Sequence, residues 1–279
     1  MKKLLIVDGH NLLFQMFYGM PSHFYGKYNQ PIWATFGFVG AMNKIINLTN
    51  PTHLLVVFDG ETHNPRNELL SEYKSNRIDY KDASDDESPF TQLPDIYRCL
   101  EALDIKYYET KVVEADDIIA GYVNKYKDIN IVIASNDSDF YQLVNKNVSI
   151  LRYKGKSSLI LNEKDIFAKI GVHPYQYADY KALVGDNTDV IKGVLGVGPI
   201  TASKLLLDYG NLNNLLANID LLKNGKIKNN IKSSIDRIRL NYKLIHLDYV
   251  DVLPFDIESL EYKNNKFTTK EVLTKLDIM

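Results

Sequence analysis

The chain has 279 residues, 45% of them hydrophobic and 24% charged, which is enough apolar material for one large domain or two smaller ones. Its single cysteine, Cys99, excludes an intramolecular disulfide and a zinc site built from several thiolates. The net charge of −2 by itself argues against a nucleic-acid-binding protein, although acidic and basic residues can gather on different parts of one surface.

The N-terminal apolar run is short and soon meets the carboxylate of Asp8, whereas a signal peptide has a longer apolar stretch. No window of the sequence reaches the roughly 18 apolar residues of a membrane span. We therefore expect a cytoplasmic protein without membrane association.

Short apolar, β-branched runs alternate with helical patterns in the first half of the chain. The helical spacing is clearest at Phe36–Leu48 and Asp116–Tyr126. Strands separated by helices predict βαβ units, and hence an α/β fold with a mostly parallel central sheet flanked by helices. The candidate strands are Leu4–Asp8, His53–Asp59, Ile105–Tyr108, Ile129–Ser135 and Val148–Tyr153.

Beyond about residue 160 the pattern changes to helices and glycine-rich turns, and we expect no further strands. We predict an α/β domain over residues 1–180 and a smaller helical region over residues 181–279. The polar, acidic segment at 79–89 is expected to be an exposed, mobile loop.

Carboxylates follow three of the predicted strands. Asp8 ends the first strand, Asp59 ends the second, and Asp137 and Asp139 follow the fourth. Parallel strands end at one edge of a sheet, where ligands bind. Two carboxylates about 4 Å apart repel each other by about 4 kcal/mol at an effective dielectric constant near 20, so a fold that gathers several must protonate them or bind cations. Carboxylate oxygens are the ligands that Mg²⁺ prefers.

Each of these acids also has an ordinary structural explanation. Glu114, Asp116 and Asp117 begin a predicted helix, where acidic residues cap the backbone and suit the helix dipole. An aspartate after a strand is a common turn residue, which also applies to Asp186 and Asp189 after Gly185. Convergence at one edge is what favours a metal site, and it depends on the strand assignments.

Other chemistries lack the residues they need. The histidines show no metal-binding spacing, and there is no Gly-x-Ser-x-Gly motif for a serine nucleophile. A GxGxxG motif for dinucleotides is also absent from the sequence.

Taken in chain order, the motifs resemble those of the bacterial and phage 5′ nucleases, which include flap endonucleases and the exonuclease domain of DNA polymerase I. The resemblance runs from about residue 3 to about residue 250. It implies a PIN-like α/β fold with a C-terminal helix-hairpin-helix region. The matching segments are Val7-Asp8-Gly9, Phe58-Asp59-Gly60, Arg66, Tyr73-Lys74-Ser75-Asn76-Arg77, Glu114-Ala115-Asp116-Asp117, Asp137-Ser138-Asp139, Gly185-Asp186 with Asp189, and the glycine-rich run from Gly193 to Gly198.

The resemblance implies a structure-specific 5′ nuclease that hydrolyses phosphodiester bonds of DNA with Mg²⁺, for which Mn²⁺ is expected to substitute. Asp117 and Asp137 would lie between two metal clusters, shared or acting through metal-bound water. In two-metal sites, one ion lowers the pKa of the attacking water and both stabilise charge on the attacking and leaving oxygens. The first cluster would be Asp8, Asp59, Glu114 and Asp116, and the second Asp139, Asp186 and Asp189.

Lys74 and Arg77 match the basic pair that the family places over the scissile phosphate. Three residues apart on a predicted helix, they would share a face. They would belong to an arch at about 63–100 that admits a 5′ strand. Within the arch, an aromatic residue such as Tyr73 or Tyr80 can stack on an unpaired base. The residues expected to contact DNA there are Arg66, Tyr73 and Lys81.

The glycine-rich run followed by a predicted helix at Thr201–Asp208 resembles the family's helix-hairpin-helix element. Glycines let backbone amides approach a phosphate, and the helix N-terminus adds partial positive charge. The resemblance also implies a monovalent cation, usually K⁺, at the hairpin. The basic stretch at 223–243 would extend the duplex contact. The hairpin residues expected to contact DNA are Lys192, Gly193, Gly196, Gly198, Thr201 and Lys204.

Four positions depart from the family pattern without removing a proposed metal ligand. Ser138 stands between the two acids where lysine is usual, and Val190 replaces a common asparagine. Ile200 replaces a frequent hairpin lysine, and Pro65 replaces an aromatic residue. The missing lysines predict weaker duplex binding, by about one unit of salt dependence per lost phosphate contact.

We expect the substrate to be DNA with 5′ flaps or 5′ ends, including RNA-primer ends, in replication or repair. We also expect a monomer, and a free-standing enzyme more than an excised polymerase domain. Two alternatives remain: a PIN-type ribonuclease, against which the hairpin argues, and a non-catalytic binder of DNA junctions, against which the retained carboxylates argue.

Overall fold

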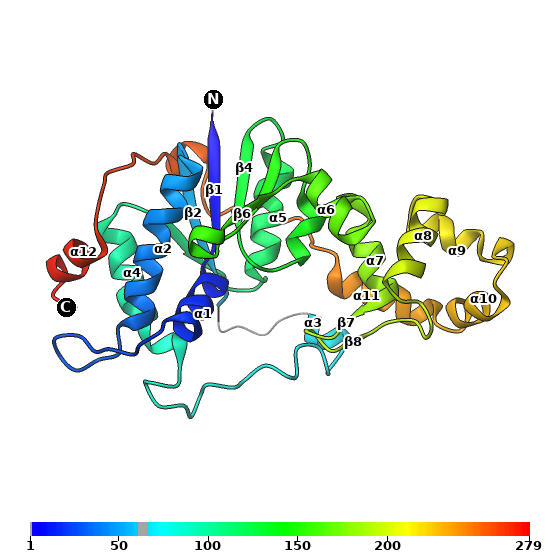
Figure 1. The fold of residues 1–279 in the computed structure, drawn as a ribbon, viewed down its shortest axis with the longest axis horizontal. Coiled ribbons are helices and arrows are strands. Elements are labelled where there is room, and N and C mark those ends of the chain that lie inside the picture. Colours follow the sequence, from blue (N-terminus) through cyan, green and yellow to red (C-terminus); the bar gives the residue numbers. More distant parts are fainter. Residues whose placement is uncertain (1, 61–65) are drawn as a thin grey trace.

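A computed structural model describes residues 2–60 and 66–279. Its centre is a six-stranded sheet with the strand order β3-β2-β1-β4-β5-β6 (Figure 1). The first five strands are parallel, and β6 runs antiparallel to β5. The strands are β1 (Lys3–Asp8), β2 (His53–Phe58), β3 (Lys106–Glu109), β4 (Asn130–Ala134), β5 (Val148–Arg152) and β6 (Leu159–Leu161).

The interiors of the central strands β1 and β2 are apolar because helices cover both faces of the sheet. Leu5 and Val7 of β1 face one core, formed with α1 (Gly9–Gly19), α2 (Trp33–Thr49) and α4 (Leu93–Ala102). Leu4 and Ile6 face the other core. That core is formed with α5 (Ala115–Lys125), α6 (Glu163–Ile170) and α7 (Tyr177–Val184).

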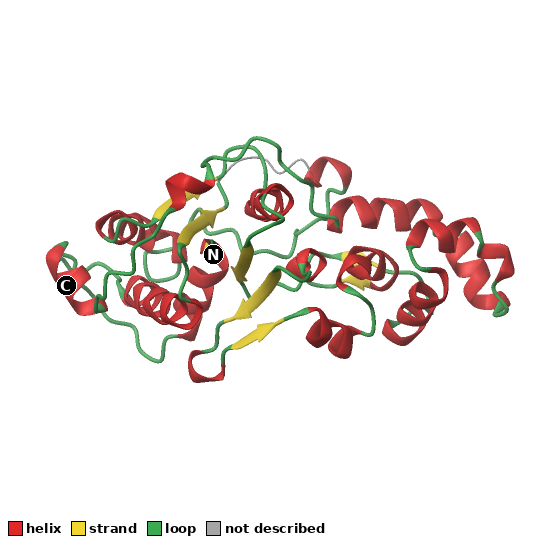
Figure 2. Ribbon diagram, turned by 90° about the horizontal axis from the view of Figure 1, so that it is seen from above, coloured by secondary structure: helices red, strands yellow, loops and turns green. Residues whose placement is uncertain are grey.

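The C-terminal helices extend to one side of the sheet, as Figures 1 and 2 show. They are α8 (Pro199–Tyr209), α9 (Leu212–Ala217), α10 (Gly225–Lys232) and α11 (Ile235–Ile245). After α11 the chain returns across the molecule, and α12 (Thr269–Lys275) packs against α2 and α4 at the opposite end. Short 3₁₀ helices lie at Pro89–Gln92, Asp139–Leu143, Gly155–Ser157, Pro174–Gln176, Ile219–Leu221 and Ile257–Leu260.

The five predicted strands and the parallel sheet are confirmed to within a residue at each end. The expectation that strands stop near residue 160 is wrong. β6 pairs with β5, and a small two-stranded sheet joins β7 (Gly185–Asp186) to β8 (Ile191–Lys192). Strands of two or three residues are too short to leave a period in the sequence.

The predicted arch at about 63–100 extends too far at its C-terminal end. Its first residues, with the departure Pro65, lie outside the described part of the chain. Residues 93–100 belong to α4, whose Ile96, Cys99 and Leu100 are buried. From here on, the arch means residues 66–92, which run from the short helix α3 (Arg66–Leu69) through turns to α4.

Among the described residues, no helix has both the length and the apolar character needed to cross a bilayer.

Candidate active site

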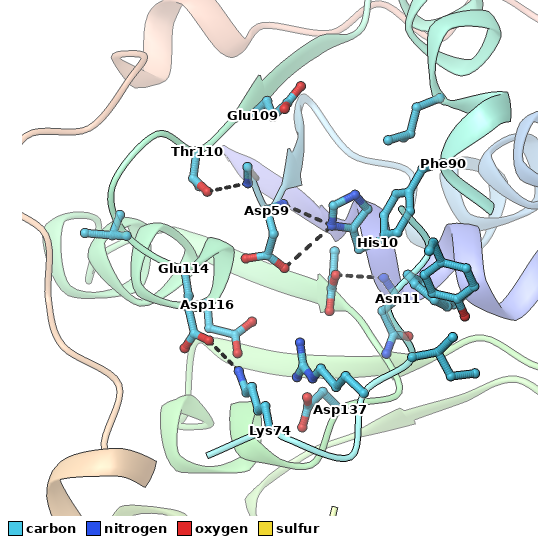
Figure 3. Close-up of a pocket in the computed structure, with 18 of the residues that line it drawn as sticks. His10, Asn11, Asp59, Lys74, Phe90, Glu109, Thr110, Glu114, Asp116 and Asp137 are labelled. Atoms are coloured by element: carbon cyan, nitrogen blue, oxygen red, sulfur yellow. Dashed lines mark hydrogen bonds and ion pairs between the residues drawn. The ribbon is translucent and has the colours of Figure 1, made fainter. Parts of the chain in front are cut away.

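The C-terminal ends of β1 and β2 open into one cavity of about 990 Å³, shown in Figure 3. The arch forms part of its wall through residues 73–80. The acids that line this cavity are Asp8, Asp59, Glu109, Glu114, Asp116 and Asp137, of which Glu109 was not predicted. The convergence predicted from the strand ends is therefore present in the structure.

Local hydrogen bonds fix the acids at the strand ends. Asp8 caps α1 by accepting the backbone N–H of Asn11 at 3.0 Å, and its other oxygen accepts the hydroxyl of Ser135 at 2.8 Å. Asp59 accepts the backbone N–H of Ala115 at 2.8 Å, which ties the end of β2 to the start of α5. Each carboxylate therefore has a defined direction.

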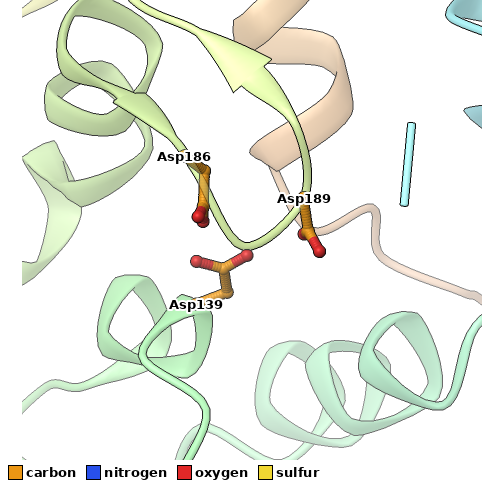
Figure 4. A group of neighbouring side chains, drawn as sticks. All are labelled: Asp139, Asp186 and Asp189. Atoms are coloured by element: carbon orange, nitrogen blue, oxygen red, sulfur yellow. The ribbon is translucent and has the colours of Figure 1, made fainter. Parts of the chain in front are cut away.

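The second predicted cluster also forms. Asp139, Asp186 and Asp189 each offer an oxygen, and these oxygens lie within 4.8 Å of one another (Figure 4). Asp186 lies on β7, and Asp189 lies in the turn between β7 and β8. The ammonium group of Lys181 bonds Asp186 and lies 3.6 Å from Oδ1 of Asp139.

Burial and the proximity of other carboxylates raise the pKa values of three of these acids. Burial, together with the charges of Asp59 and Asp137, raises the pKa of Asp8 from 3.8 to about 7. Burial and the charge of Asp137 likewise raise the pKa of Asp139 to about 7. The same causes raise the pKa of Asp116 well above its usual value. A divalent cation would relieve this repulsion, so the donor set fits a hard metal ion.

Asp59 behaves differently from its neighbours. Burial works against its charge, but the His10 ring and the N–H of Ala115 outweigh burial and lower the pKa of Asp59. The backbone N–H of Asp59 donates to Nδ1 of His10 at 3.3 Å. The pKa of Asp59 is therefore shifted in the direction opposite to the pKa values of Asp8 and Asp116.

Two arch cations reach the acids. The ammonium of Lys74 bonds Glu114, and Nη2 of Arg77 lies 3.7 Å from Oδ1 of Asp189. Burial alone would lower the pKa of Lys74, but the charge of Glu114 raises it. The prediction that both lie on one helix is wrong: residues 71–76 form turns, and Lys74 has a left-handed backbone with φ of 56°.

Three predicted site residues make close contacts within the protein. Tyr73, which was expected to contact DNA, lines the cavity, but it is 5% exposed and packs against Leu244 and Ile245. Arg66 was also expected at DNA, but it is buried in ion pairs with Glu114 and Asp117. Asp117 was expected near the metals, yet both of its oxygens accept hydrogen bonds from Arg66.

At the predicted hairpin, Lys192, Gly196, Gly198 and Lys204 are exposed, and Thr201 is half-buried. Gly198 is the N-cap residue of α8 and has no side chain to cap the first turn of that helix. Gly193 has a packing role instead, because an added Cβ would lie 2.1 Å from the carbonyl oxygen of Val184. Lys81, in the arch, is exposed.

Sequence reasoning missed several residues of the site. Lys181 precedes Asp186 by five positions, and only the packing of α7 brings its ammonium group to the acids. An aromatic wall also lines the cavity, and only its member Tyr80 was anticipated from the sequence. Its rings contact one another and belong to His10, Phe14, Tyr18, Tyr80 and Phe90.

Comparison with known families gives two adjoining matches. Residues 3–171 match the family described as 5′-3′ exonuclease, N-terminal resolvase-like domain. Residues 172–268 match the family described as 5′-3′ exonuclease, C-terminal SAM fold. Together they cover most of the chain.

Curated relatives agree with these matches. The chain is 32% identical to a 5′-3′ exonuclease of Aquifex aeolicus over 94% of this chain and 86% of that protein. It is also 32% identical to the DNA polymerase I of Caldicellulosiruptor bescii, over 99% of this chain but 32% of the polymerase. The chain thus spans about a third of the polymerases it matches.

Solved structures share the fold. The T5 D15 protein co-crystallised with metal ions superposes with a TM-score of 0.72 and 24% identity, over 88% of this chain and 90% of that one. The catalytic core of Rad2 in complex with a DNA substrate superposes with a TM-score of 0.58 and 15% identity, over 90% of this chain and 81% of that one.

Proposed function

Since this chain belongs to the 5′-3′ exonuclease family, we propose that it is a structure-specific nuclease that hydrolyses phosphodiester bonds of DNA at 5′ flaps and 5′ ends. The observation that carries the proposal is the cavity at the strand ends. Acids from separate strands and helices meet there beneath an arch that supplies Lys74 and Arg77.

The cofactor we propose is Mg²⁺, with Mn²⁺ as a substitute. Asp8, Asp59, Glu114 and Asp116 would hold one ion, and Asp139, Asp186 and Asp189 the other, with Asp137 between them. When bound, such ions activate water and stabilise charge on the phosphate oxygens. The raised pKa values of Asp8 and Asp139 support this assignment, because apposed carboxylates without cations are costly.

The protein's own groups would orient the scissile phosphate. Lys74 supplies a point charge beside the first cluster, and Arg77, with a guanidinium that is 61% exposed, can grip a phosphate through two donors. The aromatic wall, which includes Phe14 and Tyr80, offers faces on which an unpaired base can stack. A phosphate and its neighbouring base thus find complementary surfaces in one cavity.

The hairpin would hold the duplex by its backbone. The first turn of α8, together with the exposed Lys192 and Lys204, suits contacts to phosphate that do not depend on base sequence. We propose K⁺ as the cation at this hairpin. Basic residues of α10 and α11 lie further along the same region and would extend the contact.

We further propose a role in replication or repair, with RNA-primer ends as one substrate and a cytoplasmic location where such DNA is found. We propose no polymerase activity, because the chain matches only about a third of the length of the DNA polymerase I relatives. A monomer is the form we propose.

The decisive experiment is a cleavage assay on 5′-flap DNA with Mg²⁺, with EDTA, and with the variant Asp139→Asn. We expect cleavage that requires the metal and falls strongly in the variant, whereas Asp256→Asn, at an exposed ion pair with Lys125, should cleave normally. Cleavage that survives chelation would remove the metal mechanism. Preference for single-stranded RNA over flap DNA would favour the ribonuclease alternative.

A further inference from the structure

Arg66 and Asp117 form a buried ion pair in which both carboxylate oxygens of Asp117 accept hydrogen bonds from the guanidinium of Arg66. Nη1 of Arg66 donates to Oδ2 of Asp117 at 2.9 Å, and Nη2 donates to Oδ1 at 2.8 Å. Each side chain is 8% exposed. A two-donor pair of this kind fixes both partners in one plane.

The same two side chains hold a third segment of the chain. Nη2 of Arg66 donates to the carbonyl oxygen of His246 at 3.3 Å, and Oδ1 of Asp117 accepts the backbone N–H of Asp248 at 3.0 Å. His246 and Asp248 directly follow α11. The clasp, meaning these two side chains and two backbone groups, therefore joins the foot of the arch, the first turn of α5 and the end of α11.

Asp117 is poorly placed to bind a metal. Oδ1 accepts two hydrogen bonds and Oδ2 accepts one. It also does not line the cavity that its neighbour Asp116 lines. Adjacent helix residues point about 100° apart, which separates the two acids. To ligate an ion, Asp117 would have to leave a buried arginine without its partner, which is costly.

Arg66 is equally poorly placed to bind DNA, but it reaches the active site indirectly. Its Nη1 also bonds one carboxylate oxygen of Glu114, and the other oxygen of Glu114 accepts the ammonium of Lys74. The position of Arg66 therefore sets the direction of Glu114, and Glu114 sets the position of Lys74.

We propose that Arg66 and Asp117 are positioning residues, and that the clasp fixes Glu114 and Lys74 by locking the foot of the arch and the end of α11 onto α5. This inference rests on the proposed function. It assigns the two acids at the end of the Glu-Ala-Asp-Asp motif to different tasks, with Asp116 at the cavity and Asp117 in the clasp.

The test is a double-mutant cycle with Arg66→Gln, Asp117→Asn and the double variant, measured as kcat and KM on flap DNA across a Mg²⁺ titration. Arg66→Gln takes the guanidinium away from the buried Asp117, and Asp117→Asn removes one of the carboxylates that Arg66 bonds, whereas the double variant removes both charges of the pair. We expect kcat of each single variant to fall by about 10²-fold, the loss typical of a displaced reacting group. The double variant should be no slower than the slower single variant.

Two controls separate positioning from ligation and from general damage. Asp186→Asn, at a proposed ligand, should need more Mg²⁺ for half-maximal rate, whereas extra Mg²⁺ should not restore Asp117→Asn. Arg98→Gln, at the half-exposed pair with Asp95, should leave kcat unchanged. Trypsin cleavage at Lys74, Arg77 and Lys81 of the DNA-free protein gives a readout independent of activity, and should be faster in both single variants.

The proposal would be overturned if the kcat losses of the two single variants multiplied in the double variant. It would also be overturned if added Mg²⁺ fully restored the kcat of Asp117→Asn. If the single variants fail to fold, the double variant and the conservative Arg66→Lys still decide, because unchanged kcat and unchanged trypsin cleavage in both would refute it. A wild-type protein that does not cleave flap DNA would instead remove the proposed function, and the trypsin comparison would still test the clasp.

Discussion

Each of the two acidic clusters contains a lysine that bonds one of its carboxylates. Single substitutions of these lysines therefore test the contribution of a positive charge to the site. Lys74 bonds Glu114 in the first cluster, and Lys181 bonds Asp186 in the second. Both lysines are largely buried, which strengthens their effect on nearby charges because little water screens them.

Replacing Lys74 with methionine keeps the length of the side chain and removes its charge. We expect kcat on flap DNA to fall by about 10²–10³-fold, because preorganised donors contribute on this scale to the transition state. The matched control is Lys81→Met, an exposed lysine of the same arch, which should raise KM and leave kcat nearly unchanged. Equal effects of the two substitutions on kcat would contradict the role of Lys74.

Asp139 makes the stability of the metal-free protein depend on pH. Its pKa is raised from 3.8 to about 7 by burial and by neighbouring acids, so the folded state keeps this proton where the unfolded state has lost it. Stability that is present below pH 3.8 is therefore lost as pH rises towards 7. Asp139→Asn lacks this titration, and without metal its Tm should exceed that of the wild type by roughly 3–8 °C at pH 8.

Thermal unfolding in EDTA between pH 5 and pH 8 measures this difference. The gap between variant and wild type should widen as pH rises to about 7 and then level off. A Tm difference that does not change with pH would show that the pKa of Asp139 is not raised in the metal-free folded protein.

At the scale of elements, the turn between β7 and β8 carries backbone strain. Val190 has a φ of 62°, in the left-handed region that β-branched side chains rarely adopt and that asparagine tolerates. Val190→Asn should therefore raise stability by about 1–2 kcal/mol, seen as a Tm higher by roughly 2–6 °C. Val190→Ala controls for the loss of β-branching and should gain less.

The first turn of α8 carries no basic residue, and the resemblance described from the sequence predicts a lysine at position 200. Ile200 is 86% exposed there, so it contributes little to the core. Ile200→Lys should tighten duplex binding and increase the salt dependence of log K by about one unit, because one more phosphate is contacted. Ile200→Gln, which is polar without charge, should leave the slope unchanged in a fluorescence titration across salt concentrations.

The strand ends that carry Asp8 and Asp59 could be predicted because apolar runs define strands and parallel strands share an edge. The division of labour between Asp116 and Asp117 could not, since both lie in one helical turn and only packing against residues 246–248 separates them. Burial of Tyr73 likewise depends on α11, more than 160 positions along the chain. Contacts of that range leave no local pattern.

At the scale of the whole molecule, the C-terminal segment packs against the N-terminal part of the chain. Leu273 of α12 and Ile278 are fully buried with Ile32 and Val39, and Asp277 bonds both Lys27 and Tyr28. The last helix is thus part of the same core as α2.

Leu273→Ala should therefore destabilise the whole protein by about 2–5 kcal/mol and lower its Tm by roughly 5–15 °C in a single transition. Lys270→Ala, on the exposed side of the same helix, should have little effect. If Leu273→Ala instead changed only a separate transition at lower temperature and left the main unfolding transition unchanged, α12 would unfold independently of the rest of the protein. Light scattering on the same samples tests the predicted monomer.

The position of β1 has a consequence for biosynthesis. Among the strands of this sheet it is the first to be synthesised, yet it lies in the middle of the sheet and pairs with β2 and with β4, which begins at Asn130. One side of β1 must therefore wait for well over a hundred residues before its hydrogen-bonding partner exists. During that interval the nascent chain presents an apolar strand with an open edge, which makes it a natural client for chaperones that hold unfinished proteins.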